Sequence, residues 1–192
     1  MLVDPLACTL FDTDEKGLKA IKEQLLELNN MAIAGKPDDL VINTHVCRGN
    51  FHSTYVSSDA YDGVAQTLLA RENVGAYYLE FDDARSGGFA PLAAVSGDKK
   101  VVLGLVTTKR AQLEDKDAVI ARIHEAEKYL PLDRLCLSPQ CGFASCEIGN
   151  KEKDKMNEYF SYQTQPSILL FPYTKLLFKK METIWQHTRK VK

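Results

Sequence analysis

The sequence lacks several features that would place a protein in a special class. Its 192 residues contain no apolar run close to the ~20 residues of a membrane span. The opening residues, Met1-Leu2-Val3-Asp4, do not form a signal peptide. There are five cysteines, an odd number, and no internal repeat or low-complexity segment. We therefore expect a cytoplasmic protein whose thiols are reduced, and so available for metal binding or catalysis.

The sequence also lacks a strong excess of charge of either sign. Its formal net charge is −2, so we expect no broad surface for nucleic acid or for an anionic membrane. The composition, 45% hydrophobic and 26% charged, is that of a globular protein with a real core. The length suits one domain over residues 1–192.

Segments of helical and strand character alternate along the chain. The expected helices are 14–34, 59–71, 91–95 and 114–130, and the expected strands are 40–46, 76–81, 101–106 and 134–138. Residues 2–11 are expected to be the end of a further strand with its exit loop, and residues 174–187 a final helix. This alternation predicts an α/β fold built from parallel βα units, and both the doubly wound fold and the (β/α)8 barrel fit it.

Metal-binding residue types lie at the end of the expected strand 40–46. His45 and Cys47 alternate with Val46, so both side chains point to one face of the strand. Zinc accepts this mixture of nitrogen and sulfur ligands. Taken alone the pattern is a weak signal, because a cysteine is more often a small buried hydrophobe and a histidine a hydrogen-bonded core residue.

Two further candidates follow other expected strands. Glu80 lies near the end of 76–81, and Cys141 lies beyond 134–138. Because the carboxyl ends of parallel strands meet at one edge of a sheet, His45, Cys47, Glu80 and Cys141 together would make a four-coordinate zinc site. The alternatives are a solvated strand-end charge for Glu80 and a simple loop residue for Cys141. Cys136 and Cys146 compete as ligands, although Cys136 lies in mid-strand, which favours a core position.

Three motifs then resemble a known family. They are His45-Val46-Cys47-Arg48-Gly49-Asn50-Phe51, Tyr78-Leu79-Glu80-Phe81-Asp82-Asp83 and Leu137-Ser138-Pro139-Gln140-Cys141-Gly142-Phe143-Ala144-Ser145. Over residues 1–150 the sequence resembles the catalytic domain of cobalamin-independent methionine synthase, and more closely its short methionine synthase II paralogues. The resemblance implies a (β/α)8 barrel and zinc bound by His45, Cys47, Glu80 and Cys141. It also implies homocysteine and a methyltetrahydrofolate-type methyl donor as substrates.

The sequence departs from the family pattern in ways that affect the expected site. The resemblance places residue 1 near the middle of the barrel, so we expect only the C-terminal half of a TIM barrel, a truncated barrel. Asp4 stands where the family has an acidic pair, and is the expected substitute for binding the substrate ammonium group. Thr107-Thr108 stands where full methionine synthases carry a catalytic histidine, so no catalytic residue is assigned. Residues 151–192 match poorly and are expected to form a divergent tail with a closing helix.

The leading interpretation is a zinc-dependent methyltransferase that methylates the thiol of homocysteine. The alternatives are alkyl transfer to another thiol, and a non-catalytic half-barrel that binds zinc and needs a partner half. An open parallel sheet leaves backbone groups unpaired at its edges, so we expect a homo-oligomer or a separate N-terminal half. Arg48, Asp82 and Asp83 adjoin the expected ligands, and we expect them to orient those ligands or to have a structural role, without binding zinc. The alternative is that they are solvated charges at the rim of the sheet.

Overall fold

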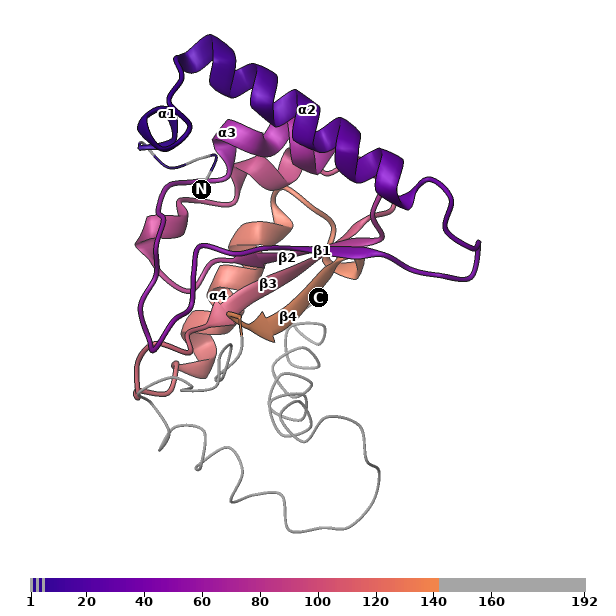
Figure 1. The fold of residues 1–192 in the computed structure, drawn as a ribbon. Helices are drawn as coiled ribbons and strands as arrows, with labels where there is room; N and C mark the ends of the chain where they lie inside the picture. Colours follow the sequence, from indigo (N-terminus) through magenta and orange to yellow (C-terminus); the bar gives the residue numbers. More distant parts are fainter. Residues whose placement is uncertain (1, 3, 5, 142–192) are drawn as a thin grey trace.

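The computed structural model describes residues 2, 4 and 6–141; the remaining residues are drawn as a grey trace in Figure 1. The expected final helix at 174–187, the tail at 151–192 and Cys146 lie outside the described residues. The helices are α1 (Ala7–Leu10), α2 (Glu15–Ile33), α3 (Asp62–Val64), the π-helix η1 (Ala65–Leu69) and α4 (Lys116–Glu127), with short 3-10 helices η2 (Ala84–Ser86), η3 (Ala90–Ala94) and η4 (Leu132–Arg134). The strands are β1 (Asn43–Val46), β2 (Ala76–Glu80), β3 (Lys100–Val106) and β4 (Leu135–Pro139).

The four strands form one parallel sheet in the order β1-β2-β3-β4, so each strand pairs with the next along the chain. The register places His45 beside Tyr78 and Glu80 beside Gly104. Helical segments connect successive strands, because parallel strands need a crossover connection. The predicted α/β class with parallel βα units is confirmed.

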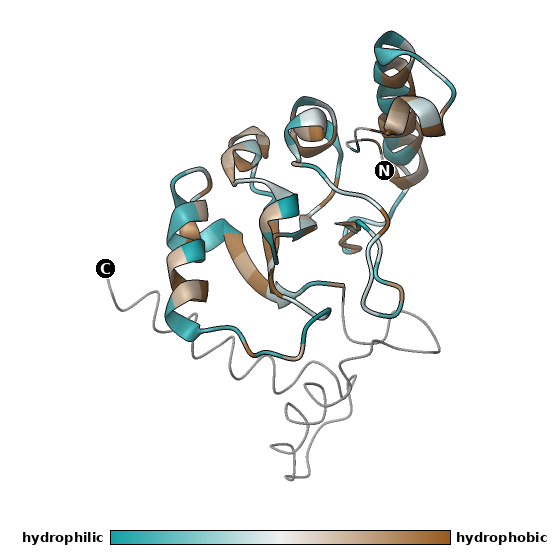
Figure 2. Cartoon of the chain, turned by 90° about the vertical axis from the view of Figure 1, so that its left-hand side faces the viewer, coloured by the Kyte–Doolittle hydropathy of each residue, from teal (hydrophilic) through white to brown (hydrophobic). Residues whose placement is uncertain are grey.

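One face of the sheet carries large apolar side chains and is covered by helices. Tyr77, Leu79, Leu103 and Leu135 are at most 2% exposed and belong to the main core cluster, together with Ile123 of α4. Figure 2 shows the strands largely brown, with helices arranged on one side of them. Burial of such side chains from water is the main stabilising term for a fold of this kind.

The opposite face carries smaller or more polar residues at the alternating positions. His45 of β1, Glu80 of β2, Gly104 of β3 and Ser138 of β4 are near one another by register. The burial pattern of β1 alternates between exposed and half-buried residues, whereas β3 is buried from Val101 to Val106. The polar residues therefore lie on the face that the helices leave open.

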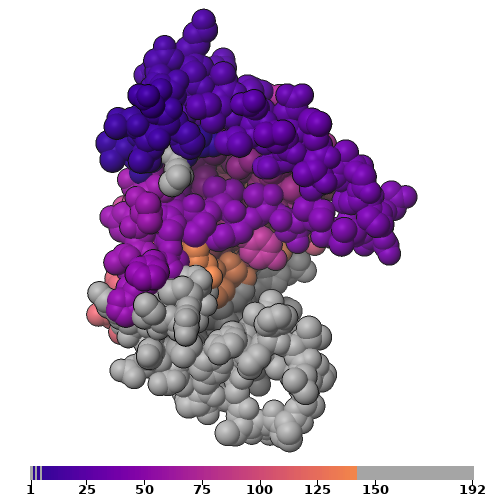
Figure 3. All heavy atoms as spheres, viewed as in Figure 1, coloured from indigo at the N-terminus to yellow at the C-terminus, as the bar shows by residue number. Residues whose placement is uncertain are grey.

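Two of the helices begin as their sequences predict. The side chain of Asp14 accepts a hydrogen bond from the N–H of Gly17 (2.7 Å) at the start of α2, and Asp115 accepts one from Ala118 (2.9 Å) at the start of α4. The predictions of helices at 14–34 and 114–130 are confirmed with slightly shorter bounds. Helix α2 forms one side of the described part of the molecule in the space-filling view (Figure 3).

Three sequence predictions need correction. The described residues of 2–11 contain the helical turn α1 and no strand. The side chain of Asp4 accepts from the N–H of Leu6 (2.9 Å) and its carbonyl accepts from Ala7 (2.8 Å), which starts a turn. The helix expected at 59–71 begins only at Asp62 and continues as a π-helix. The short helix expected at 91–95 is a 3-10 helix. None of the helices among the described residues is long and apolar enough to cross a membrane.

Candidate metal centre

Four side chains with metal-binding atoms converge at the carboxyl end of the sheet. They are His45 on β1, Cys47 just after it, Glu80 at the end of β2 and Cys141 just after β4, and one ligand atom from each lies within 4.8 Å of all the others. The Sγ atom of Cys141 lies 3.3 Å from His45 Nε2, 3.1 Å from Cys47 Sγ and 2.8 Å from Glu80 Oε1. The four candidates chosen from the sequence are thus brought together, although 96 residues separate the first from the last.

The loop after β1 fixes the position of Cys47. The N–H of Gly49 donates a hydrogen bond to Cys47 Sγ (3.1 Å), and Gly49 has φ of 98°, a conformation that favours glycine. A Cβ atom at this position would lie 2.8 Å from the backbone nitrogen of Val56, so glycine is also needed for close packing. The preceding residue, Arg48, donates its backbone N–H to Glu80 Oε1 (3.1 Å), which ties this loop to the end of β2.

The side chain of Arg48 is a structural part of the site. It is 2% exposed, its guanidinium donates to the carbonyl of Asp59, and it lies over the ring of Tyr61 at 4.0 Å. The hydroxyl of Tyr61 accepts a hydrogen bond from the N–H of Glu80 (2.7 Å) and donates to the carbonyl of Val46 (3.4 Å). Arg48 and Tyr61 therefore hold the ends of β1 and β2 together beneath the cluster.

Glu80 is fully buried, and its two carboxylate oxygens have different surroundings. Burial by itself would raise the pKa of Glu80, but hydrogen bonds from Cys141, Gln140 and the backbone of Arg48 outweigh this and hold the pKa below its usual value. All three donors reach Oε1, whereas Oε2 accepts no hydrogen bond from the described residues and lies 3.8 Å from Arg85 Nη2. Oε1 is therefore the carboxylate oxygen that faces Cys141, whereas Oε2 faces the guanidinium of Arg85.

Cys141 has an unusual backbone conformation and an unusual thiol. Its φ of 52° is rare for a residue other than glycine, asparagine or aspartate, and such conformations cluster at functional sites. Burial raises the pKa of the Cys141 thiol, and the hydrogen bonds to Glu80 and Cys47 raise it further. The thiol donates a hydrogen bond to Glu80 Oε1 (2.8 Å).

The set of one imidazole nitrogen, two sulfurs and one carboxylate oxygen fits zinc better than calcium or magnesium, which prefer oxygen ligands. The spacing of the donor atoms agrees with a site of this kind. The cluster is a candidate zinc centre.

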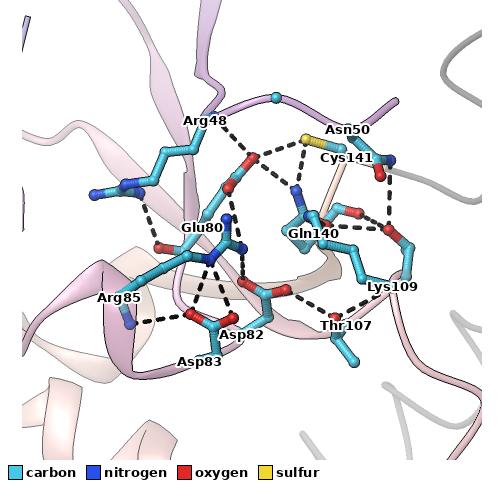
Figure 4. A network of polar contacts seen from close by, with 12 residues as sticks. Arg48, Asn50, Glu80, Asp82, Asp83, Arg85, Thr107, Lys109, Gln140 and Cys141 are labelled. Carbon is cyan, nitrogen blue, oxygen red and sulfur yellow. Dashed lines mark hydrogen bonds and ion pairs between the residues drawn. The ribbon is translucent and has the colours of Figure 1, made fainter. Parts of the chain in front are cut away.

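The charged residues that follow β2 pair mainly with one another, although Arg85 also pairs with the Oε2 atom of Glu80 at 3.8 Å. Arg85 donates to Asp82 (3.1 Å) and to Asp83 (2.9 Å), and Asp82 also accepts from the hydroxyl of Thr107 (2.8 Å) (Figure 4). Neither aspartate belongs to the group of four side chains within 4.8 Å. The predicted role of these residues in orienting ligands remains a prediction.

Two residues near the cluster were not singled out from the sequence. Gln140, 1% exposed, precedes Cys141, and Lys109 follows β3 with its side chain directed at Gln140 (Figure 4). Burial lowers the pKa of Lys109, while Asp82 and Glu80 offset part of this effect. In the sequence, only their position could have indicated that these two residues lie near the cluster, because both follow parallel strands whose ends meet at this edge.

Asp4, the expected ligand of a substrate ammonium group, has backbone partners in this structure. One carboxylate oxygen accepts from the N–H of Ser58 (2.9 Å) and the other from Leu6 (2.9 Å), and these bonds lower the pKa of Asp4. Asp4 is not among the four clustered side chains. Its predicted role stays a prediction.

Comparison with known proteins identifies the family. The family model described as "Cobalamin-independent synthase, Catalytic domain" matches residues 20–157, which are most of the chain and include all four clustered residues. The chain belongs to this family. The resemblance seen in the sequence motifs is thereby confirmed.

Relatives in this family are longer than the chain. YxjG of Bacillus subtilis (strain 168), an uncharacterized protein, is 49% identical over 160 residues, which cover 78% of this chain and 42% of YxjG. YxjH of the same organism, also uncharacterized, is 53% identical over 122 residues, which cover 63% of this chain and 32% of YxjH. The chain therefore spans less than half the length of these relatives.

Two solved structures are similar in fold. A putative vitamin-B12 independent methionine synthase from Listeria monocytogenes aligns with a TM-score of 0.58 and 30% identity, covering 88% of this chain and 41% of that protein. A B12-independent methionine synthase from Shewanella sp. W3-18-1, in complex with selenomethionine, aligns with a TM-score of 0.58 and 16% identity, covering 90% and 45%. At 16% identity the likeness shows the fold alone. The four parallel strands of this chain, with the helices that connect them, are thus those of a methionine synthase-type catalytic domain.

Proposed function

We propose that this chain carries the zinc site of a methyltransferase that methylates the thiol of homocysteine from a methyltetrahydrofolate-type donor. The observation that carries the proposal is the convergence of His45, Cys47, Glu80 and Cys141 within 4.8 Å, in a chain of the cobalamin-independent synthase family. Homocysteine, the folate-type donor and zinc are inferences from that family.

The chemistry required of such a site is limited. A bound zinc ion lowers the pKa of a thiol and keeps it as a nucleophilic thiolate at neutral pH. The sulfur lone pair forms the new S–C bond to the methyl group, and the electrons of the broken N5–C bond remain on N5, which takes up a proton. His45 and Cys47 are exposed, so a substrate thiol can approach the cluster from their side. Glu80 and Cys141 hold the buried side through hydrogen bonds within the protein.

Metal analysis combined with a methyl-transfer assay tests the proposal. We expect one zinc per chain in the wild-type protein, and a large loss of zinc in both Cys47→Ser and Cys141→Ser, because each removes a thiolate ligand. Cys8→Ser is the matched control, since Cys8 is a half-buried cysteine on α1 outside the cluster. Full retention of zinc in both cluster variants would refute the assignment.

Transfer of another alkyl group, or transfer to another thiol, uses the same residues and is the first alternative. Competition assays with homocysteine, cysteine and other small thiols distinguish the acceptors.

In the proposed reaction Asp4 binds the ammonium group of the amino acid, so Asp4→Asn should raise KM for homocysteine more than it lowers kcat. Equal KM values for the variant and the wild type would remove Asp4 from the substrate site. A cytoplasmic location, where thiols stay reduced, is part of the proposal.

A second candidate is a half-barrel that needs additional strands for activity. Its support is the edge strand β1, whose residues are at best half-buried, and the 41–45% of the solved structures that this chain covers. Exposed strand edges invite further pairing. Either a second copy of this chain or a separate N-terminal half would supply the strands. Light scattering, and methyl-transfer assays with and without an added N-terminal half from a longer relative, distinguish these forms from an active monomer.

A further inference from the structure

The side chain of Gln140 touches two of the four clustered residues at once. Its Nε2 donates to Glu80 Oε1 (2.7 Å) and to Cys141 Sγ (2.8 Å), so the amide nitrogen contacts two candidate ligands. Its Oε1 accepts from Thr108 Oγ1 (3.1 Å) and from Lys109 Nζ. The amide is 1% exposed, and Figure 4 shows it between Lys109 on one side and Glu80 with Cys141 on the other.

Lys109 determines which way this amide faces. The oxygen and nitrogen of an amide exchange places when the group turns over, but a lysine ammonium has only donors and requires the oxygen. The reversed amide would place its N–H groups against Lys109 and its oxygen against the carboxylate of Glu80. Both contacts would be repulsive, so Lys109 keeps the amide nitrogen facing Glu80 and Cys141.

Donors of the same kind reach the cluster from the backbone. The N–H of Gly49 donates to Cys47 Sγ, and the N–H of Arg48 donates to Glu80 Oε1. Gln140 supplies from a side chain what these backbone groups supply elsewhere. The backbone donors cannot be removed by substitution of a side chain, whereas the amide of Gln140 can.

We propose that Gln140 is a positioning residue, whose amide, oriented by Lys109, holds Glu80 and Cys141 in the geometry that binds the metal. The proposal rests on the proposed zinc site. Partners that orient metal ligands in this way typically contribute about 10–100-fold in metal affinity. A hydrogen bond from N–H to a metal-bound sulfur also reduces the electron density that the sulfur donates, so it changes the absorption of a coloured metal.

The test uses the full chain and has readouts that do not depend on activity. Zinc affinity is measured by competition with a chelator, and the sulfur-to-metal charge-transfer band is measured with Co²⁺ in place of zinc. For Gln140→Leu we expect a loss of about 10–100-fold in zinc affinity and a shifted Co²⁺ band. For Lys109→Met we expect a smaller change in the same direction. Gln66→Leu, at an exposed glutamine of η1, is the matched control and should leave both readouts unchanged.

The double variant separates the two roles. Because Lys109 acts through Gln140, the affinity of Lys109→Met/Gln140→Leu should equal that of Gln140→Leu alone, and additive losses would refute the orienting role of Lys109. If Gln140→Leu does not fold, as circular dichroism would show, Gln140→Glu takes its place, since it keeps the shape and replaces a donor by a negative charge. Wild-type zinc affinity and an unshifted Co²⁺ band in a folded Gln140 variant would refute the role of Gln140. Absence of metal binding by the wild-type protein would instead refute the zinc site itself.

Discussion

Replacement of Tyr61 by phenylalanine removes the two hydrogen bonds that the hydroxyl makes beneath the cluster. Tyr61 is completely buried, and its hydroxyl accepts from the N–H of Glu80 at 2.7 Å. Tyr61→Phe keeps the ring, and with it the contacts to Arg48 and Phe81, so no large cavity forms. The N–H of Glu80 is left buried without an acceptor, which costs about 1–3 kcal/mol. For a chain of this size we expect a fall in Tm of about 2–12 °C.

The pH dependence gives a second, independent signature. Burial raises the pKa of Tyr61 from 10.0 to about 12, and the nearby Arg48 offsets part of this effect. Folding therefore favours the protonated hydroxyl, so its contribution to the free energy of unfolding is complete below pH 10 and declines as the pH rises toward 12. Between pH 10 and pH 12 the free energy of unfolding of the wild type should fall by about 3 kcal/mol, at about 1.4 kcal/mol per pH unit. Tyr61→Phe lacks the group, so the difference between the two proteins should shrink from pH 10 to pH 12.

Guanidinium unfolding at pH 7 and at several values between pH 9 and 12 measures both effects. Tyr129→Phe is the control, because Tyr129 is 41% exposed and its substitution should change stability by no more than about 0.5 kcal/mol. The reasoning is wrong if Tyr61→Phe is as stable as this control at pH 7. It is also wrong if the stability curves of the wild type and Tyr61→Phe run parallel above pH 10.

Three further predictions follow from the geometry of the cluster. Gly49→Ala should destabilise the protein by at least about 1–2 kcal/mol in chemical unfolding, because its φ of 98° and the nearby backbone both oppose a Cβ atom. The control is Gly35→Ala, which should be neutral because no atom lies within 4 Å of the added Cβ. Equal effects of the two substitutions would contradict the prediction. Gly104→Ala should destabilise by about 1–3 kcal/mol, since its Cβ would lie 2.9 Å from a carbonyl oxygen of β2, and an unchanged Tm would exclude this contact. Zinc binding at pH 7 should release the proton of Cys141, whose pKa is raised, so zinc affinity should fall as the pH is lowered. Calorimetry in buffers of different ionisation enthalpy measures the number of protons released. Release of no proton would refute the prediction.

The architecture could be predicted from the sequence because the local sequence patterns of the helices and strands agree with the way the strands pair in the sheet. The continuous apolar run at Val101–Val106 is typical of a strand buried on both faces, and β3 occupies the centre of the sheet beside β2. The aspartate caps Asp14 and Asp115 each stand at the start of a helix. The segment at 2–11 was mispredicted, because a turn stabilised by the side chain of Asp4 outweighs the strand preference of its apolar residues.

The candidate site was predicted only in part, and the reason is physical. His45, Cys47, Glu80 and Cys141 belong to residue types with a known affinity for zinc, so each was a candidate, and the family resemblance implied the set of four. Gln140 has no such chemistry of its own. It matters because its side chain lies between Lys109 and two members of the cluster, and contacts between residues so far apart in sequence cannot be found from spacing.

The four clustered residues are supported unequally, and this bears on how the proposed site would work. Glu80 and Cys141 lie on the buried side, where donors from Gln140 and the backbone of Arg48 fix the carboxylate and the thiol. His45 and Cys47 belong to the edge strand and its loop, and both are exposed. A metal held by all four residues would therefore link the edge of the sheet to its interior, and metal binding would stabilise the folded position of β1. The same asymmetry leaves access to the metal on the side of His45 and Cys47, so a substrate thiol would approach across β1 and not through the hydrogen-bonded residues behind Glu80.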